Sequence, residues 1–312
     1  MKTSHRSKTV KMGAMRLEKL SFLLPALLLI FIMVIYPILA TILLSFNIDI
    51  VVGAEVSDKP PSLENYFKAF SSRELLNWKG VETGTFPMGA LIHNALWVAI
   101  HLPITTILGL LLAVLLQNVR GASIIRSLIF LGMVVPMIVG GLLIAFSFDK
   151  DIGIVNFLLN TLGLKMFVKT WTTYPDTALF ALILGSVWLW TGFSVVTYSA
   201  GLASIPKEII EAALIDGAKF RTILFKIIIP LLKPVTVAVV AMTIIWDLKI
   251  FDIVYVATRG GPGGASMVLS ILMWDYFARV TDYTMSATIA TILTFIILPV
   301  AIIWVKLVMR GR

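Results

Sequence analysis

Side chains that commonly carry catalysis or hold metals are scarce in this sequence. It contains 3 His and no Cys, which excludes disulfides, thiolate metal sites and cysteine nucleophiles. These residues form no metal-binding or acid–base constellation, so the sequence does not predict an enzyme. It also lacks a GxxxxGK[ST] phosphate loop and therefore does not hydrolyse ATP by that route. The glycine-rich stretch RGGPGGAS (259–266) has no lysine after its glycines. We expect a turn there, leading into a helix near Ser266.

Polar chemistry inside the apolar part of the chain is concentrated in one segment, 234–257, which holds Asp247, Lys249 and Asp252. Ionisable residues at membrane depth mark functional sites by default. Lys249 and Asp252 stand three residues apart, so they can pair on a helix. Asp247 lies about 20 Å from the inner end of the segment at 1.5 Å per residue. It is therefore the deepest acid and the first candidate for a polar contact with a substrate.

The elements that must position these groups are membrane helices. The mean hydropathy is +0.96 and only 14% of residues are charged, against about 25% in soluble domains. A spanning helix needs about 20 apolar residues, and six segments are apolar enough. They are 20–46, 90–116, 126–148, 178–202, 234–257 and 284–308. The prediction is an all-α integral membrane protein with six transmembrane helices.

Lysine and arginine bias sets the orientation of the spans. With the N-terminus inside, the inner segments hold 16 basic and 4 acidic residues, and the outer loops hold 9 basic and 11 acidic residues. The net charge of +9 is then a topology signal, and we expect no nucleic-acid partner. The first apolar run exceeds the roughly 7–15 residues of a signal peptide, so we expect it to remain as a span. Residues 1–19 form a cytoplasmic tail, and 20–312 form the membrane domain.

The loop 203–233 between spans four and five is then cytoplasmic, and it contains an amphipathic helix. Ile210, Ala213, Leu214 and Gly217 recur at helical spacing on one side. Gly217 stands where a helix can end in a left-handed cap, and a second helical stretch follows over 219–229. One interpretation is a helix lying on lipid headgroups. Acids on the polar face favour a protein partner instead, because membrane-surface helices prefer Lys and Arg there.

The same loop resembles a known motif. EAALIDGAKFRTILFKIIIP (211–230) is similar to the EAA signature of permease subunits in binding-protein-dependent ABC importers. Its landmarks are Glu211-Ala212-Ala213, Gly217, Ile227 and Ile229-Pro230, with Ile229 where the signature has leucine. Stretches at 36–46, 63–70, 108–136, 153–164 and 251–266 resemble the carbohydrate-uptake branch, with its maltose- and glycerol-phosphate-type permeases.

This resemblance implies an ABC type I importer permease, with a core over 90–308 and the loop as a cytoplasmic coupling helix. It implies a second homologous permease, two ATP-binding cassette subunits and an extracellular sugar-binding protein as partners. ATP binds to those ATPase subunits, so no cofactor is expected on this chain. The location implied is the inner membrane of a prokaryotic cell, with both termini cytoplasmic. The coupling residues implied are Glu211, Ala212, Ala213, Asp216, Gly217, Lys219 and Pro230.

A sugar path would pass near the membrane midplane. Trp188 and Trp190 lie roughly 15–18 Å into their span, and tryptophan faces suit the C–H faces of sugar rings. Two residues apart, they point in different directions, so we expect one to line the path; packing against the partner permease is the alternative. His93 and His101 are expected to be packed. The candidate path residues are Trp188, Trp190, Asn94, Trp246, Asp247 and Tyr255.

Two other classes of membrane protein fit this sequence less well. A stand-alone secondary transporter or channel would show acidic proton or cation sites at the midplane and often inverted repeats. Here the deep charge is sparse and no repeat is evident. A membrane enzyme would need a metal or acid–base cluster, which 3 His without Cys do not provide. The sequence therefore favours the permease subunit of an ATP-driven sugar importer.

Overall fold

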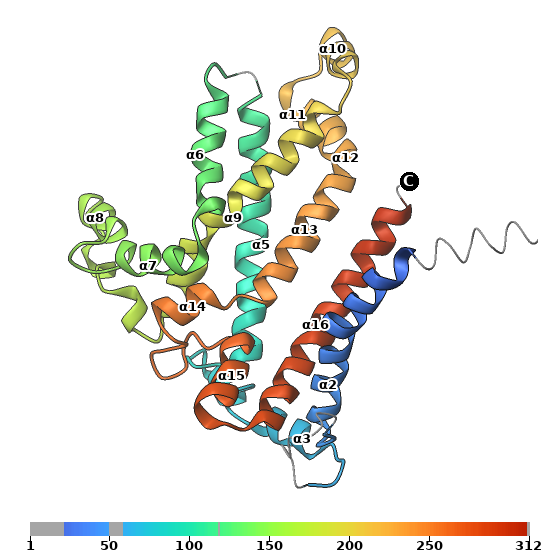
Figure 1. The fold of residues 1–312 in the computed structure, drawn as a ribbon. Helices are drawn as coiled ribbons and strands as arrows, with labels where there is room; N and C mark the ends of the chain where they lie inside the picture. The colour runs from blue at the N-terminus through green and yellow to red at the C-terminus, as the bar shows by residue number, and fades with distance from the viewer. Residues whose placement is uncertain (1–21, 50–58, 118, 311–312) are drawn as a thin grey trace, which may run out of the picture.

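The computed structural model describes residues 22–49, 59–117 and 119–310, and every regular element in them is helical (Figure 1). The predicted tail, 1–19, lies outside these residues. Four helices are long and apolar enough to cross a membrane: Phe22–Ser45, which ends in α2 (Tyr36–Ser45), α5 (Ala90–Leu115), α9 (Ala178–Ala203) and α16 (Tyr283–Arg310). Two bent pairs raise the number to six if each pair is one span.

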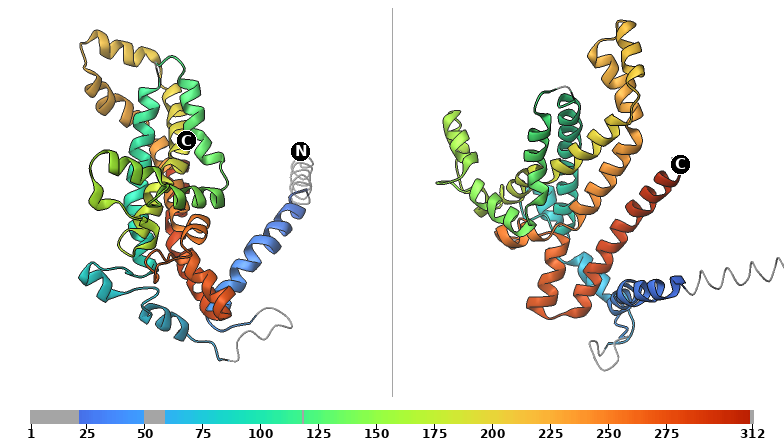
Figure 2. Two further views of the ribbon diagram at one scale, coloured as in Figure 1. Left: turned by 90° about the vertical axis from the view of Figure 1, so that its left-hand side faces the viewer. Right: turned by 45° about the horizontal axis from the view of Figure 1, so that its top comes forward.

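The shorter helices gather at the two ends of the bundle. Figures 1 and 2 show α10 (Lys207–Ile215) at one end, and α3 (Glu64–Ser71) and α15 (Leu269–Asp275) toward the other. Apart from α6, α7 and α13, the remaining elements are η1 (Phe31–Ile35), α4 (Trp78–Thr83), α8 (Ile154–Thr161), η2 (Lys165–Phe167), η3 (Trp171–Thr173), α11 (Phe220–Ile223), η4 (Leu224–Ile228), α12 (Ile229–Leu231), α14 (Asp252–Ala257) and η5 (Tyr276–Val280). The chain from Phe220 runs through Pro230 to Leu231, beyond the predicted end at 229.

The first bent pair corrects the prediction of a straight third span over 126–148. α6 (Ala122–Val134) and α7 (Met137–Ser147) meet at 103°. The break falls at Val135, which is extended (φ −65°, ψ 129°). Pro136 follows it, and a proline disfavours helical geometry in the residue before it. α7 therefore lies across the direction of α6.

The fifth span predicted over 234–257 is not one continuous helix, because α13 (Lys233–Leu248) ends before α14 begins at Asp252. The stretch Lys233–Ala257 that contains both forms the second bent pair with Phe220–Leu231, at 69°. Asn94 of α5 donates to the carbonyls of Asp247 and Leu248. It thereby satisfies acceptors that a continuous helix would have used. The predicted Lys249–Asp252 pair does not form, because the two residues lie on either side of this break.

α9 is the central helix of the bundle. It packs against α5, α6, α7 and α13. In its most apolar 18-residue stretch 61% is buried, whereas none of the corresponding stretch of the first helix, Phe22–Ser45, is buried. Small residues allow this close packing. A Cβ on Gly109 of α5 would lie 2.2 Å from Ser194 Cβ of α9. A Cβ on Gly132 of α6 would lie 2.9 Å from the Trp188 carbonyl oxygen.

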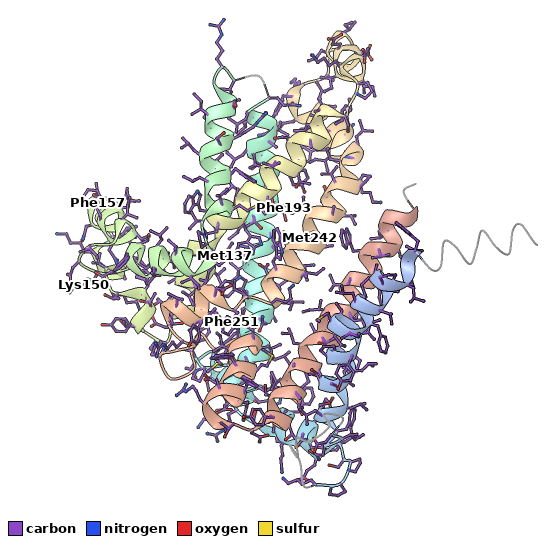
Figure 3. All side chains as sticks on the ribbon, viewed as in Figure 1. Met137, Lys150, Phe157, Phe193, Met242 and Phe251 are labelled. Carbon is purple, nitrogen blue, oxygen red and sulfur yellow. The ribbon has the colours of Figure 1, made fainter. Side chains whose placement is uncertain are left out.

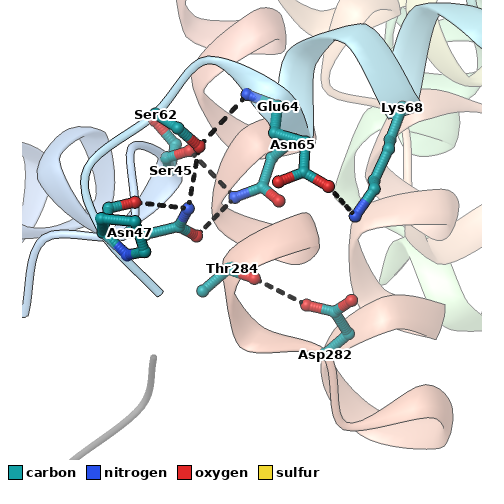
Figure 4. Close-up of polar contacts among 9 residues, drawn as sticks. Ser45, Asn47, Ser62, Glu64, Asn65, Lys68, Asp282 and Thr284 are labelled. Carbon is teal, nitrogen blue, oxygen red and sulfur yellow. Dashed lines mark hydrogen bonds and ion pairs between the residues drawn. The ribbon is translucent and has the colours of Figure 1, made fainter. Parts of the chain in front are cut away.

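Polar contacts tie the end of the first helix to α3 and α16 (Figure 4). Asn65 of α3 donates to Asn47 Oδ1 at 2.7 Å and to the Ser45 carbonyl at 3.3 Å. Asp282 Oδ1 accepts from Thr284 Oγ1 and from the Met285 amide, both at 2.9 Å, at the start of α16. Thr288 Oγ1 of α16 donates to the Ser45 carbonyl at 3.5 Å, so the end of the first helix is joined to both α3 and α16.

Candidate functional site

A cluster of aromatic rings lies in the bundle between α9 and α13. Trp190 and Trp246 meet edge to face with their centroids 5.2 Å apart, and Phe193 lies 4.8 Å from Trp246. His101 of α5 adds a fourth ring, 6.0 Å from Trp190. Edge-to-face packing is a favoured geometry for such rings. Three separate helices therefore meet at this cluster.

Asp247 and His101 bring charge to the same place. His101 Nδ1 lies 2.7 Å from Asp247 Oδ1, and both side chains are about 2% exposed or less. The contact is an ion pair when the imidazole is protonated. A buried carboxylate requires such a partner, because desolvation of an isolated charge is costly. The prediction that His101 is packed agrees with this position. The sequence reasoning missed its partner.

Several buried polar atoms in the cluster have no hydrogen-bond partner among the described residues. They are Trp190 Nε1, His101 Nε2 and Asp247 Oδ2. Most buried polar groups in proteins are hydrogen-bonded, so each exception calls for an explanation. The cluster thus combines aromatic faces with unused polar atoms. Both suit a hydroxylated, ring-shaped substrate.

Trp188 and Trp190 point to different sides of α9. Trp190 is 9% exposed and lies inside the aromatic cluster, whereas Trp188 is 43% exposed and contacts α6 at Gly132. Trp190, but not Trp188, thus joins Trp246 and Asp247. That one of the two lines a path stays a prediction.

Asn94 lies near the start of α5, and Tyr255 lies in α14. Asn94 is buried, and besides the two carbonyls at the end of α13 it binds the Leu269 amide at 2.8 Å. Its amide therefore joins α5, α13 and α15. Tyr255 stacks on Phe251 with the centroids 5.2 Å apart, and the Arg259 guanidinium lies 5.9 Å from its ring centroid. Figure 3 labels Phe193 and Phe251, which lie at different levels along the bundle.

The loop helix α10 forms an exposed surface at the other end. Gly217 has φ +75°, the Ala218 amide donates to the Ala213 carbonyl, and the Gly217 amide donates to the Leu214 carbonyl. This is a Schellman cap, as the glycine predicted. Ile210 and Ala213 pack on the membrane domain. Leu214 is 57% exposed, so it does not join the buried stripe expected of it.

The predicted coupling residues lie on or beside this exposed surface. Glu211, Ala212, Asp216, Gly217, Lys219 and Pro230 are exposed and Ala213 is half-buried. Two large apolar side chains that sequence reasoning did not single out stand beside them: Ile215 is 87% exposed and Phe220 58%. Exposed apolar groups next to charges mark a protein contact surface. Their exposure is the signal that identifies them, and it comes from the structure.

A polar cavity of about 490 Å³ lies between α10, α6 and the end of α9. Glu211 and Lys207 line it from α10, with Arg126 of α6 and Ser199 of α9 opposite. Arg126 Nη2 donates to the Leu116 carbonyl at 3.0 Å. The cavity therefore places α10 beside α6 and α9.

Comparison with known proteins agrees with this arrangement. Residues 105–311 match the family model described as the binding-protein-dependent transport system inner membrane component. A probable ABC transporter permease of Pyrococcus horikoshii is 56% identical, over 88% of this chain and 92% of that protein. The trehalose/maltose transport system permease MalF of Thermococcus litoralis is 31% identical, over 93% of this chain and 94% of the relative.

A solved structure shares the fold. The bacterial ABC transporter that imports the acidic polysaccharide alginate gives a TM-score of 0.77 at 16% identity, over 97% of this chain and 99% of that one. At 16% identity this likeness shows the fold alone. The family is shown by the family model and by the sequence relatives, which cover most of the chain. The chain therefore belongs to the family of inner-membrane components of binding-protein-dependent transport systems.

Proposed function

We propose that this chain forms half of the translocation path of an ATP-driven sugar importer and pairs with a second, homologous permease. Sugar as the substrate class is supported by the cluster of Trp190, Trp246 and Phe193, which offers aromatic faces beside unused polar atoms. The trehalose/maltose permease among the relatives points the same way. Asp247 and Trp190 are the residues proposed to contact the sugar, and Asn94 and Tyr255 support the outer end of the path.

The observation that carries the proposal is the exposed helix α10. It ends in a glycine cap, presents Glu211 and Ile215 outward, and lies at one end of the bundle (Figures 1 and 2). A short capped helix transmits a push better than a loose linker does. We infer that α10 and the chain to Pro230 dock on a separate ATPase subunit, which binds ATP. The termini then lie in the cytoplasm of a prokaryotic cell, and the opposite end faces an external sugar-binding protein.

Co-purification tests this assembly. The chain, extracted in mild detergent from its source cells, is expected to bring an ATPase subunit and a second permease with it. In proteoliposomes that contain the complex and the binding protein, one of a panel of sugars is expected to stimulate ATP hydrolysis. Sugar uptake by this chain alone, without ATP, would overturn the proposal.

A second candidate function is a stand-alone, proton-coupled transporter. The observation that favours it is the buried His101–Asp247 contact, since a titratable pair at membrane depth is typical of proton relays. This candidate predicts uptake driven by a pH gradient in liposomes that hold this chain alone. The sugar importer predicts no uptake under that condition, so one assay separates the two.

A further inference from the structure

The segment between α7 and α9, residues 149–177, is here named the outer arm. Its helix α8 carries its apolar side outward. Ile154, Phe157 and Leu158 are 62%, 67% and 52% exposed. They recur at helical spacing and so share one face. On the opposite side, Asn156 is fully buried. A helix on a water-soluble surface has the reverse arrangement.

Asn156 fixes this orientation of α8. Its Nδ2, which has two hydrogens, lies within hydrogen-bond distance of the carbonyl oxygens of Phe148, Asp149 and Lys169, at 3.2, 2.8 and 2.9 Å. Its Oδ1 accepts from the Lys169 amide at 3.3 Å. Rolling α8 to bury its apolar face would break these contacts and leave buried polar groups unpaired, which is costly. The outward apolar face is therefore built into the arm.

The apolar face continues beyond the helix. Large apolar side chains before and after α8 are also exposed: Ile152 72%, Leu162 72%, Leu164 43%, Met166 84% and Phe167 47%. So many exposed large apolar side chains in one short segment are unusual on protein facing water and indicate contact with a protein or a membrane. The arm therefore needs a non-aqueous neighbour.

The geometry of α6 and α7 identifies that neighbour. α6 has 13 residues, which span about 20 Å, less than the hydrocarbon thickness of about 30 Å. α7 then turns by 103° and carries exposed Ile138, Leu142 and Phe146. Figure 1 shows α7 and α8 extending to one side of the bundle. The arm thus leaves the bundle sideways, as a continuation of a membrane segment.

We propose that the outer arm is an interfacial anchor whose apolar face inserts into the outer leaflet of the bilayer. Trp171 and Tyr174 follow the face and are partly exposed, as suits residues at the headgroup level. The charges balance: the lysines are Lys150, Lys165 and Lys169, and the acids are Asp149, Asp151 and Asp176. Insertion is therefore driven by apolar burial, and it is insensitive to salt and to anionic lipid.

Site-specific fluorescence tests the anchor, and the absence of native cysteine makes it simple. The variants Phe157→Cys and Leu162→Cys, on the apolar face, are each labelled with the fluorophore bimane in the purified complex. Asn160→Cys and Asp151→Cys, at exposed polar positions, are matched controls. In vesicles of phosphatidylcholine and phosphatidylglycerol, brominated lipid is expected to quench Phe157 and Leu162 at least about twofold more than the controls. Iodide in the aqueous phase is expected to quench the two control positions more than Phe157 and Leu162.

Two outcomes would overturn the proposal. Strong iodide quenching at Phe157 and Leu162 would place the face in water. Protection of both positions from iodide and from brominated lipid would mean that another protein covers it. Labelled variants are compared only if they elute with the intact complex, so a misfolded variant is not scored. Raising the salt or removing phosphatidylglycerol is expected to leave the lipid quenching unchanged.

Discussion

His101 Nδ1 lies 2.7 Å from Asp247 Oδ1, and the contact joins α5 to the last turn of α13 deep in the bundle. Removing one partner leaves the other buried without compensation, which typically costs about 3–5 kcal/mol. His101→Leu is therefore expected to lower the melting temperature of the purified complex sharply. His101→Leu combined with Asp247→Leu is expected to recover most of that loss, because neither polar group then remains.

Thermal unfolding of both single variants and the double variant in one detergent measures the coupling. His93→Leu is the matched control, since His93 is a buried imidazole on the same helix that contacts the Met267 carbonyl rather than a carboxylate. A double variant destabilised by the sum of the two single effects would show that the two side chains act independently.

Gly109 controls the crossing of α5 and α9. A Cβ there would lie 2.2 Å from Ser194 Cβ, closer than any real contact, so Gly109→Ala forces the helices apart. Overpacking of this kind costs roughly 1–3 kcal/mol. Ser194→Gly in the same chain is expected to recover part of the loss, because it removes the Cβ at 2.2 Å while the Ser194 backbone C and Cα remain 3.1 and 3.2 Å from the new methyl group. The melting temperature measures both effects, and Ala99→Ser on an exposed face of α5 serves as control. If Ser194→Gly does not raise the melting temperature of the Gly109→Ala protein, the close contact of α5 and α9 at these two residues is contradicted.

Local sequence rules predicted the loop well. The spacing of Ile210 and Ala213 and the position of Gly217 specify a short capped helix, and the structure has one. Apolar run length likewise predicted the long helices, because spanning a bilayer is a constraint on composition and length. Such features depend on residues near each other in the chain.

The features that the sequence did not reveal arise from contacts between distant segments. α13 stops at Leu248 because Asn94, 154 residues away, binds its carbonyl. The His101–Asp247 contact also joins different helices, so neither histidine nor acid spacing could indicate it. Pro136 was a visible signal for the break before α7, but apolar run length alone ignores it. The exposed face of α8 became meaningful only once Asn156 was seen to be buried.

The hydrogen bond between Tyr276 and Glu74 makes the stability of the folded protein depend on pH. Its hydroxyl donates to Glu74 Oε2 at 2.8 Å, and burial, then the Glu74 carboxylate, raises the pKa of Tyr276 above its usual 10.0. The folded state thus keeps this proton when the unfolded phenol has lost it. This contribution to stability is full below pH 10 and declines as the pH rises above it.

Melting temperatures between pH 8 and 11 check this, with Tyr276→Phe as the comparison. The variant is expected to melt lower than the parent protein near pH 8, and the difference is expected to shrink above about pH 10. Tyr36→Phe, a membrane-helix tyrosine far from Glu74 in sequence, is the control. A difference that stays constant with pH would contradict the role given to the proton.

Coupling through α10 predicts loss of uptake without loss of the protein. Glu211 is exposed and lines the cavity shared with Arg126, so Glu211→Lys places a third cation beside Arg126 and Lys207. Gly217 has φ +75° and donates its amide to the Leu214 carbonyl at 3.0 Å. Gly217→Pro permits neither, because proline fixes φ near −65° and has no amide hydrogen. Both variants are expected to abolish ATP-driven sugar uptake in proteoliposomes.

Membrane content and co-purification locate the defect. Both variants are expected to reach the membrane at normal levels, because α10 lies outside the spans and a Cβ on Gly217 would meet no neighbouring atom within 4 Å. The amount of ATPase subunit recovered with them is expected to fall. Glu208→Lys on the same helix keeps the cap and does not line the cavity, so it is expected to retain uptake. Normal uptake in Glu211→Lys and Gly217→Pro would refute the coupling role, because the two changes disable the surface by unrelated means.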